Sequence, residues 1–282
     1  IVDLIVVNDT GSTDGTQDII KKWCEDNNLP LFLEERPFDN FENSRNHGMK
    51  MAKGKFDYCF WLDADEVMEV DMKVFNKNKL DKDLYMFNTY IGSMKYTRNE
   101  CWKVDKPFRW WGPVHEFIVC DQPNISSGLM DGLCVKVHMD GGSWKGNVAD
   151  KYKKHSAILE DYIDNIDRNP RWVFYTAQSY HDAASLPDNR PENEERSLKY
   201  YRERVNRFDG YEEERYYSQF RIGSIMRSLE EPWCDTMQEL LKAYAMDPLR
   251  AESIKLIIDH YLGNGEWHLA YLYSKFAKAN FS

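Results

Sequence analysis

The sequence lacks several features that would place it in common functional classes. No apolar run approaches the roughly 20 residues that a helix needs to cross a bilayer, and no signal peptide is recognisable. Positive charge is not in excess, because 37 Lys and Arg stand against 47 Asp and Glu, a formal net charge of −10 at pH 7. This balance disfavours nonspecific binding to nucleic acid or to an anionic membrane. We therefore expect no nucleic-acid partner and no transmembrane segment.

Paired cysteines and the common phosphate-binding loops are also missing. The six cysteines include no C-x-x-C pair, which disfavours a cysteine-built zinc site and favours a reducing compartment. We therefore expect a cytoplasmic protein. Neither G-x-G-x-x-G nor G-x-x-x-x-G-K-[ST] occurs, so the two best-known glycine-rich nucleotide motifs are excluded. The chain opens on Ile1 rather than Met, and we expect a processed, trimmed or partial chain.

What is present reads as a soluble globular protein of one large or two ordinary domains. The 282 residues are 42% hydrophobic and 30% charged. Near the N-terminus, apolar strand patterns at 2–8, 29–35 and 56–62 alternate with helical patterns at 13–28 and 38–54. This alternation predicts a parallel sheet with helical crossovers, in which the first strand is buried and ligands bind beyond the carboxyl ends of the strands.

The hydrophobic pattern of the sequence changes twice after the third predicted strand. Short alternating runs at 84–92, 117–120 and 133–139 predict additional strands, some of them antiparallel. From about residue 150 the spacing predicts paired helices, with Pro170 ending the first and a polar loop at 185–196. We therefore predict an α/β domain over 1–148 and an all-α, helical-hairpin extension over 149–282.

The loop "NDTGSTDGT", which includes Asp9, Gly11 and Ser12, joins the first strand to the first helix. One interpretation is a tight connection in which the glycines permit positive φ. The other is a nucleotide site, with Asp9 accepting a hydrogen bond from a nucleobase and backbone N–H groups meeting a ribose or phosphate. The particular order of the loop favours the second.

Arg45 lies on the apolar stripe of the helix predicted at 38–54, four residues from both Phe41 and Met49. An unpaired charge there would be costly. Either Arg45 is a buried structural residue paired with a carboxylate, or it points at a diphosphate, for which its fork of donors is suited. Spacing alone leaves both interpretations open.

The apolar strand pattern at 56–62 runs directly into the carboxylates of "LDADE". In an extended segment Asp63 and Asp65 would project from the same face, and two hard carboxylates at a rim suit Mg²⁺ or Mn²⁺. A solvated turn is one alternative. A D-x-D phosphatase is another, but it needs a later G-D-x-x-x-D pair, which is absent, and a D-x-D on the first strand.

The segments "VVNDTGSTDGT", "FENSRN" and "FWLDADE", in this order, resemble the family-two, GT-A-fold glycosyltransferases. The similar subgroup includes lipopolysaccharide core glucosyltransferases and the sublancin S-glycosyltransferase. The resemblance covers about residues 1–145 through motifs and implies a Rossmann-like, mostly parallel GT-A sheet followed by tetratricopeptide-like helices. Family members normally begin with a further strand and helix, which this sequence does not contain.

The resemblance also implies roles for residues of this sequence. The nucleotide-sugar residues would be Asp9, Gly11, Ser12, Arg45, Asn46 and Asp63. The metal residues would be Asp63, Asp65 and His138. "VHE" at 114–116 is similar to a segment near the acceptor side, so Glu116 is the expected general base, with Asp140 as the fallback. His115 and Glu116 forming a salt-bridged corner is the structural alternative.

The expected function is metal-dependent, inverting transfer of a sugar from a nucleoside-diphosphate sugar, UDP-linked, to a saccharide or protein acceptor. Mn²⁺ or Mg²⁺ is the expected cofactor. Trp110, Trp111 and Trp144 are candidates for stacking on sugar, although core packing is their commoner role. The competing class is a non-catalytic helical-repeat scaffold that carries a degenerate transferase domain.

Overall fold

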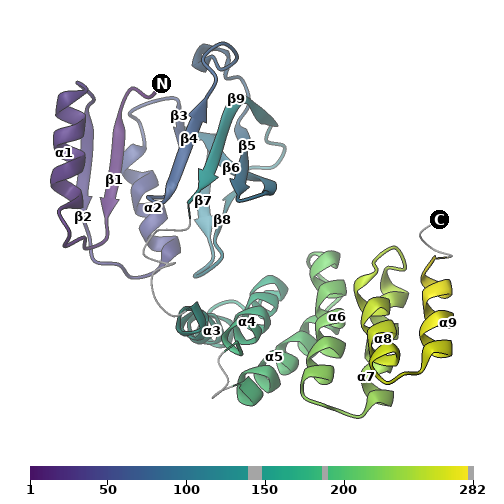
Figure 1. The fold of residues 1–282 in the computed structure, drawn as a ribbon. Coiled ribbons are helices and arrows are strands. Elements are labelled where there is room, and N and C mark those ends of the chain that lie inside the picture. Colours follow the sequence, from purple (N-terminus) through teal and green to yellow (C-terminus); the bar gives the residue numbers. More distant parts are fainter. Residues whose placement is uncertain (139–147, 186–189, 279–282) are drawn as a thin grey trace. The chain divides into compact units, whose positions relative to one another are not determined.

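A computed structural model of the chain describes residues 1–138, 148–185 and 190–278. The chain divides into two compact units, residues 1–146 and 147–282. The N-terminal unit is mixed α/β and the C-terminal unit is helical, which confirms the predicted fold class (Figure 1).

The described part of the N-terminal unit alternates strands and helices first and then continues as strands. Its elements are β1 (Ile5–Asp9), α1 (Thr16–Asp26), β2 (Leu31–Glu35), α2 (Phe41–Ala52), β3 (Tyr58–Phe60), β4 (Glu66–Val70), a 3₁₀ turn (Lys77–Lys79), β5 (Leu84–Ile91), β6 (Met94–Lys103), β7 (Phe108–Trp111), β8 (Phe117–Cys120) and β9 (Ser127–Val137).

The first three predicted strands exist, but they do not form one parallel sheet. β1 and β2 pair in parallel through the α1 crossover, as expected. β3 instead pairs antiparallel with β6, because Trp61 and the residues of β3 use the backbone of β6 as their hydrogen-bonding edge. The expectation of a buried first strand was also wrong. Among the residues of β1 only Asp9 is buried, because in the described residues β1 has a single strand partner.

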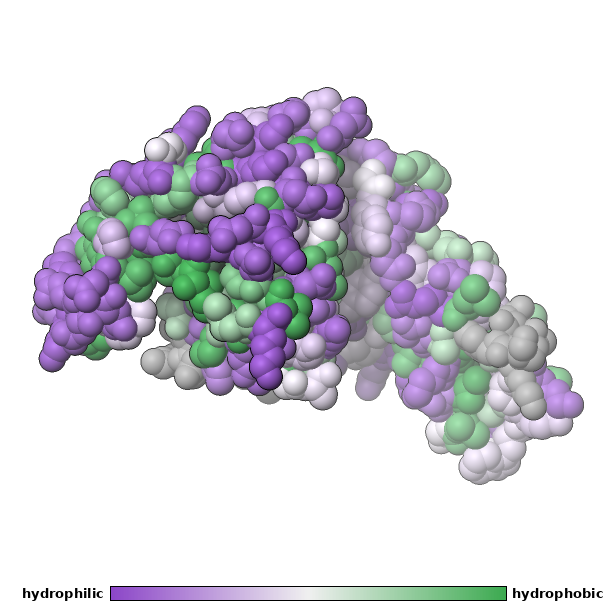
Figure 2. Space-filling view, turned by 90° about the horizontal axis from the view of Figure 1, so that it is seen from above, coloured by the Kyte–Doolittle hydropathy of each residue, from purple (hydrophilic) through white to green (hydrophobic). Residues whose placement is uncertain are grey.

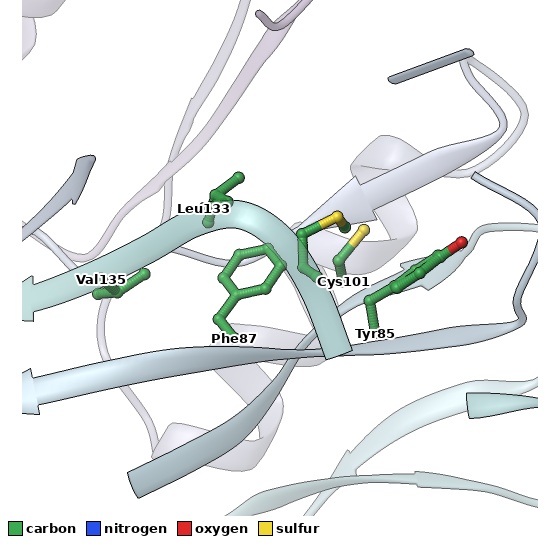
Figure 3. Close-up of a cluster of buried hydrophobic side chains, with 6 residues drawn as sticks. Tyr85, Phe87, Cys101, Leu133 and Val135 are labelled. Atoms are coloured by element: carbon green, nitrogen blue, oxygen red, sulfur yellow. The ribbon is translucent and has the colours of Figure 1, made fainter. Parts of the chain in front are cut away.

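A mixed sheet of five strands, in the order β3-β6-β5-β9-β4, forms the centre of the described part of this unit. β5 pairs antiparallel with β6 and parallel with β9, and β9 pairs antiparallel with β4. A buried cluster on β5, β6 and β9 includes Tyr85, Phe87, Cys101, Leu133 and Val135 (Figure 3). The sheet is thus held by side chains from strands that are distant in the sequence.

The hairpin of β7 and β8 is a separate two-stranded ladder. Phe108, Trp110 and Ile118 of this hairpin pack with Leu84 and Trp102 into a second buried cluster. A two-stranded hairpin is only marginally stable by itself, so contacts with the rest of the unit decide where the hairpin lies.

The helical unit consists of helices that each pack against the next along the chain (Figure 1). They are α3 (Val148–Asn165), α4 (Pro170–Ala183), α5 (Arg190–Val205), α6 (Glu212–Ser228), α7 (Trp233–Met246), α8 (Glu252–Gly263) and α9 (Trp267–Lys278). The predicted helical hairpins are confirmed, whereas their tetratricopeptide character stays a prediction.

The first helix of this unit ends before Pro170, as expected. Pro170 opens α4 at its first position, behind the Asn169 cap, where a missing N–H costs nothing. One local expectation for this unit was wrong. The described part of the predicted polar loop, from Arg190, is helix rather than loop. Two i,i+4 ion pairs stabilise this helix, although its residues are typical of turns. They join Arg190 with Glu194 and Glu192 with Arg196.

None of the described helices is long and apolar enough to cross a membrane. On the face shown in Figure 2, hydrophilic side chains predominate and hydrophobic ones lie between them. Large exposed hydrophobic side chains include Ile19 and Trp23 on α1. The apolar stripe of α1 therefore buries only Cys24.

Candidate active site

Helix α2 links the ends of β1 and β3. Its cap is Asn40, whose side chain accepts a hydrogen bond from the Asn43 amide. Ser44 O accepts a hydrogen bond from Asn8 Nδ2 of β1, while the next residue, Arg45, pairs with Asp63 beyond β3. Neighbouring residues of α2 thus contact β1 and the segment that follows β3.

The loop after β1 is organised by the carboxylate of Asp9. Asp9 Oδ1 accepts hydrogen bonds from Gly11 N at 2.9 Å, Ser12 N at 2.9 Å and Gln17 Nε2 at 3.1 Å. Gly11 has φ +113°, a conformation that favours glycine. Burial raises the pKa of Asp9. The hydrogen bonds from Ser12, Gly11 and Gln17 outweigh burial and lower the pKa to about 2. An ionised Asp9 therefore shapes this loop.

The D-x-D segment is a turn rather than an extended strand end. Glu66 N donates to Asp63 O at 3.1 Å, and Asp63 N donates to Glu66 Oε2 at 3.0 Å. The alternation argument that placed Asp63 and Asp65 on one face of a strand was therefore wrong. Glu66, for which the sequence suggested only an orienting role, is buried and closes the turn.

Arg45 is paired with two carboxylates. Its Nη2 donates to Asp63 Oδ2 at 3.0 Å, its Nη1 lies 2.9 Å from Asp63 Oδ1, and its Nε donates to Glu116 Oε1 at 2.6 Å. The guanidinium also lies over the rings of Trp61 and Trp110, 4.8 and 4.7 Å from their centroids. Of the two interpretations left open by the sequence, the structure shows the pairing with carboxylates.

The environments of Asp63 and Glu116 separate their pKa values. Burial raises the pKa of Asp63, but Arg45 and the hydrogen bond from Trp61 Nε1 outweigh it, so the pKa lies below its ordinary value. Burial raises the pKa of Glu116, Arg45 opposes this only in part, and the pKa stays above its ordinary value. A carboxylate that stays ionised thus lies on one side of Arg45 and a more basic one on the other.

Asn46 and Glu42, on the same helix, bind backbone groups of the β7–β8 hairpin. Asn46 Nδ2 donates to Trp110 O and Trp110 N donates to Asn46 Oδ1, both at 2.9 Å. Gly112 N donates to Glu42 Oε2 at 3.0 Å. Both hydrogen-bonding atoms of the Asn46 amide are therefore used within the protein.

The three predicted metal residues are not gathered into a preformed cluster. Within the described residues, no three His, Cys, Asp or Glu side chains form a group that could hold a metal ion. His138 N donates to Asp65 O at 3.0 Å, so these two residues are neighbours through their backbones. No hydrogen bond or ion pair of the Asp65 carboxylate occurs in the described part of the chain. The carboxylate of Asp63 is taken by Arg45 and Trp61.

Sequence reasoning missed a second layer of charge behind the D-x-D turn. Arg98 Nη2 lies 2.5 Å from Glu66 Oε1, and Arg98 Nε lies 2.6 Å from Glu100 Oε1. Burial raises the pKa of Glu100 to about 8, with Arg98 opposing it. Alternation alone could not have found it, because Glu100 is the extra residue of a bulge in β6, where Tyr85 pairs with Cys101 and Met86 with Asn99.

The remaining candidate site residues either pack against other aromatic side chains or lie outside the described residues. Trp110 is buried and packs edge-on against Trp61 and Trp102, so the structure gives it the core role. Trp111 packs against Phe117. Asp140, the fallback base, and Trp144 lie outside the described residues.

The mixed α/β unit, its loop after β1 and the acidic turn after β3 agree with the expected GT-A fold. Residues 2–101 match the model described as glycosyl transferase family 2. This finding confirms the resemblance of the three motifs.

Curated relatives agree with this assignment. The chain is 23% identical over 229 residues to the SPbeta prophage-derived glycosyltransferase SunS of Bacillus subtilis, which covers 76% of this chain and 49% of that protein. The same values hold for the glycosyltransferase SunS of Bacillus phage SPbeta. This chain is also 26% identical over 133 residues to the abequosyltransferase RfbV of Salmonella typhimurium. The aligned segment covers 47% of this chain and 39% of that protein. The chain thus spans about half the length, or less, of these relatives, and the comparisons support glycosyl transfer as the class of reaction.

Proposed function

We propose that the chain is a metal-dependent, inverting glycosyltransferase that moves a sugar from a UDP-linked donor to a saccharide or protein acceptor. The observation that carries the proposal is the pairing of Arg45 with both Asp63 of the D-x-D turn and Glu116 of the β7–β8 loop. The pairing holds Asp63, the candidate donor-side carboxylate, next to Glu116, whose pKa is raised. Asp63 and Arg45 lie in the segment that matches glycosyl transferase family 2.

The residues of the turn fit Mn²⁺ or Mg²⁺ held jointly with a diphosphate. Such ions are commonly bound through one or two carboxylates and substrate phosphates rather than by a complete protein cage. Asp65 offers a hard carboxylate without a partner in the described residues, and His138 adjoins it. Asp65 would hold the ion, with Asp63 and His138 as further candidates. The bound ion would neutralise charge on the departing diphosphate.

The donor would lie against the loop of Asp9, Gly11 and Ser12. In the structure Gly11 N and Ser12 N already donate to Asp9, so the loop presents a preshaped surface rather than free backbone donors. The buried Asp9 holds that shape at neutral pH because its pKa is about 2. Preorganised sites need no rearrangement when the ligand binds.

Glu116 would act as general base. Its carboxylate takes the proton of the acceptor hydroxyl as the acceptor oxygen bonds to the anomeric carbon of the donor sugar. The bond from that carbon to the diphosphate oxygen breaks on the opposite side, so the configuration inverts and the nucleoside diphosphate leaves. A raised pKa suits this role, because a base works best when its pKa approaches the working pH.

Turnover of a panel of UDP-sugars with Mn²⁺ tests the proposal, using Asp65→Asn against Asp71→Asn. The two aspartates flank β4 at its opposite ends, and only Asp65 belongs to the turn. Asp65→Asn should lower turnover on the order of 100-fold or more, whereas Asp71→Asn should match the parent chain.

Three outcomes would change the assignment. Equal turnover of the two variants would remove the metal role of Asp65. A parent chain that neither binds UDP with Mn²⁺ in calorimetry nor turns over any donor would favour the helical-repeat scaffold. Release of phosphate from an aryl phosphate without any sugar nucleotide would favour the phosphatase.

A further inference from the structure

Three side chains on one face of α2 hold the β7–β8 hairpin. Glu42, Arg45 and Asn46 stand at i, i+3 and i+4, so they lie side by side on the helix. Each bonds to a different point of the hairpin, Gly112, Glu116 and Trp110 respectively. These bonds join residues 64 to 71 positions apart in the chain. We call these three residues the α2 clamp.

The side-chain amide of Asn46 makes the two backbone hydrogen bonds with Trp110 that a neighbouring strand would otherwise make. β7 is hydrogen-bonded to β8, with Trp110 opposite Ile118. The amide of Asn46 satisfies both the N–H and the C=O of Trp110. Because buried backbone groups need partners, Asn46 specifies how far β7 lies from α2 and at which register.

Glu42 and Arg45 hold the loop that follows β7. Gly112 has φ +116° and His115 φ +56°, so the loop reverses sharply just before Glu116. The carboxylate of Glu42 binds the first amide of the loop and the guanidinium of Arg45 binds the carboxylate at its end. Hydrogen bonds in which a partner is ionised are stronger than those between neutral groups, so one helix positions both ends of the loop.

We propose that the α2 clamp positions Glu116 for deprotonation of the acceptor. The inference rests on the proposed function, in which Glu116 is the base. Three donor nitrogens of Arg45 are bound to carboxylates, and both hydrogen-bonding atoms of Asn46 are bound to Trp110. The segment "FENSRN" therefore acts through the hairpin, as a set of positioning residues.

The clamp predicts a separation between rate and affinity. A small displacement of a catalytic group can cost about 100-fold in rate without altering donor contacts. Asn46→Ala should lower kcat at least about 10-fold while the UDP dissociation constant, measured with Mn²⁺, stays within about twofold. Asn43→Ala is the matched control, because Asn43 is on the same helix but its side chain bonds to Asp39. It should leave both quantities unchanged.

A second pair of variants guards against misfolding of Asn46→Ala. Glu42→Gln keeps an oxygen acceptor for Gly112 N and should retain most of the kcat, whereas Glu42→Ala should lose it. Hydrogen exchange of the Trp110 and Gly112 amides should quicken in the respective alanine variants, while both variants stay folded.

The outcomes distinguish the clamp from the proposed function. A rise of 10-fold or more in the UDP dissociation constant of Asn46→Ala, with kcat at saturation unchanged, would show a nucleotide contact and overturn the clamp. Unchanged kcat and unchanged amide exchange in both alanine variants would also overturn it. A parent chain without any transfer would sink the proposed function, and amide exchange would then still decide whether the clamp holds the hairpin.

Discussion

At the scale of single residues, Arg45 decides the charge of the site. One guanidinium, with a side chain only 15% exposed, is shared by Asp63 and Glu116. Asp63 receives two contacts from it and a further hydrogen bond from Trp61, whereas Glu116 receives one. This asymmetry explains why the pKa of Asp63 is lowered and that of Glu116 is raised. Two carboxyl groups whose pKa values are driven apart are suited to different roles.

The pH dependence of turnover should follow from this sharing. Glu116 is inactive as a base when protonated, so kcat should fall as the pH drops through its raised pKa. Arg45→Gln removes the cation that favours the carboxylate, and the pKa of Glu116 should rise further. The acidic limb of the kcat profile should therefore move to higher pH, whatever the absolute rate.

Profiles of the parent chain, Arg45→Gln and Arg36→Gln provide the measurement. Arg36 pairs with Asp39 at the surface, and its loss should leave the limb in place. A limb that does not move in Arg45→Gln would show that Glu116 is not the group observed.

At the scale of elements, the turn between β3 and β4 depends on β6. Glu66 closes the turn and is itself held by Arg98, which also faces Glu100. One guanidinium does not neutralise two buried carboxylates, and burial raises the pKa of Glu100 to about 8 despite Arg98. At neutral pH Glu100 is therefore mostly protonated, which leaves Arg98 to balance Glu66.

Removing Arg98 should consequently destabilise the sheet more than removing an exposed cation. Arg98→Met leaves the buried Glu66 carboxylate without its partner and should cost about 3 kcal/mol in the free energy of unfolding. Lys136→Met breaks a pair with the half-exposed Glu69 and should cost less than about 1 kcal/mol. Urea unfolding measures both values, and equal costs would refute the ion pair as a support of the turn.

At the scale of the whole molecule, each unit has a hydrophobic core of its own. The N-terminal unit buries the clusters around Phe87 and Trp102. The helical unit buries a cluster that includes Leu240, Ile254 and Ile257. Because apolar burial is the main source of stability, damage to one core should leave the other unit folded.

Gly223→Ala tests this independence. A Cβ at Gly223 would lie 2.7 Å from Leu240 Cδ2 and 3.1 Å from Leu240 N, so α6 and α7 would have to separate. The helical unit should lose about 1–3 kcal/mol of stability. Binding of UDP with Mn²⁺, assigned to the N-terminal unit, should stay within about twofold of the parent chain.

Gly263→Ala is the matched control, because nothing lies within 4 Å of a Cβ at that position. It should leave the melting temperature nearly unchanged. A large loss of UDP affinity in Gly223→Ala would show that the helical unit contributes to the donor site.

Much of the architecture could be predicted because it is encoded locally. Helices α4 to α9 follow from apolar spacing, and β1, β2, β5, β8 and β9 follow from short apolar or alternating runs. Three short motifs in order already indicated the similarity of residues 2–101 to glycosyl transferase family 2. The strand partners could not be predicted, because β3 bonds to β6 and β5 to β9 across intervening segments.

The sequence by itself determined which residues carry charge at the ends of strands and most of the helical segments, since both depend on neighbours a few positions away. Only the tertiary structure decided what those charges meet. Arg45 reaches Glu116 across 71 positions, Asn46 reaches Trp110 across 64, and Arg98 reaches Glu66 across 32. Such contacts depend on strand order and on the placement of a hairpin, which periodicity does not record. They turn a segment expected at the nucleotide into one that binds the loop of the proposed base.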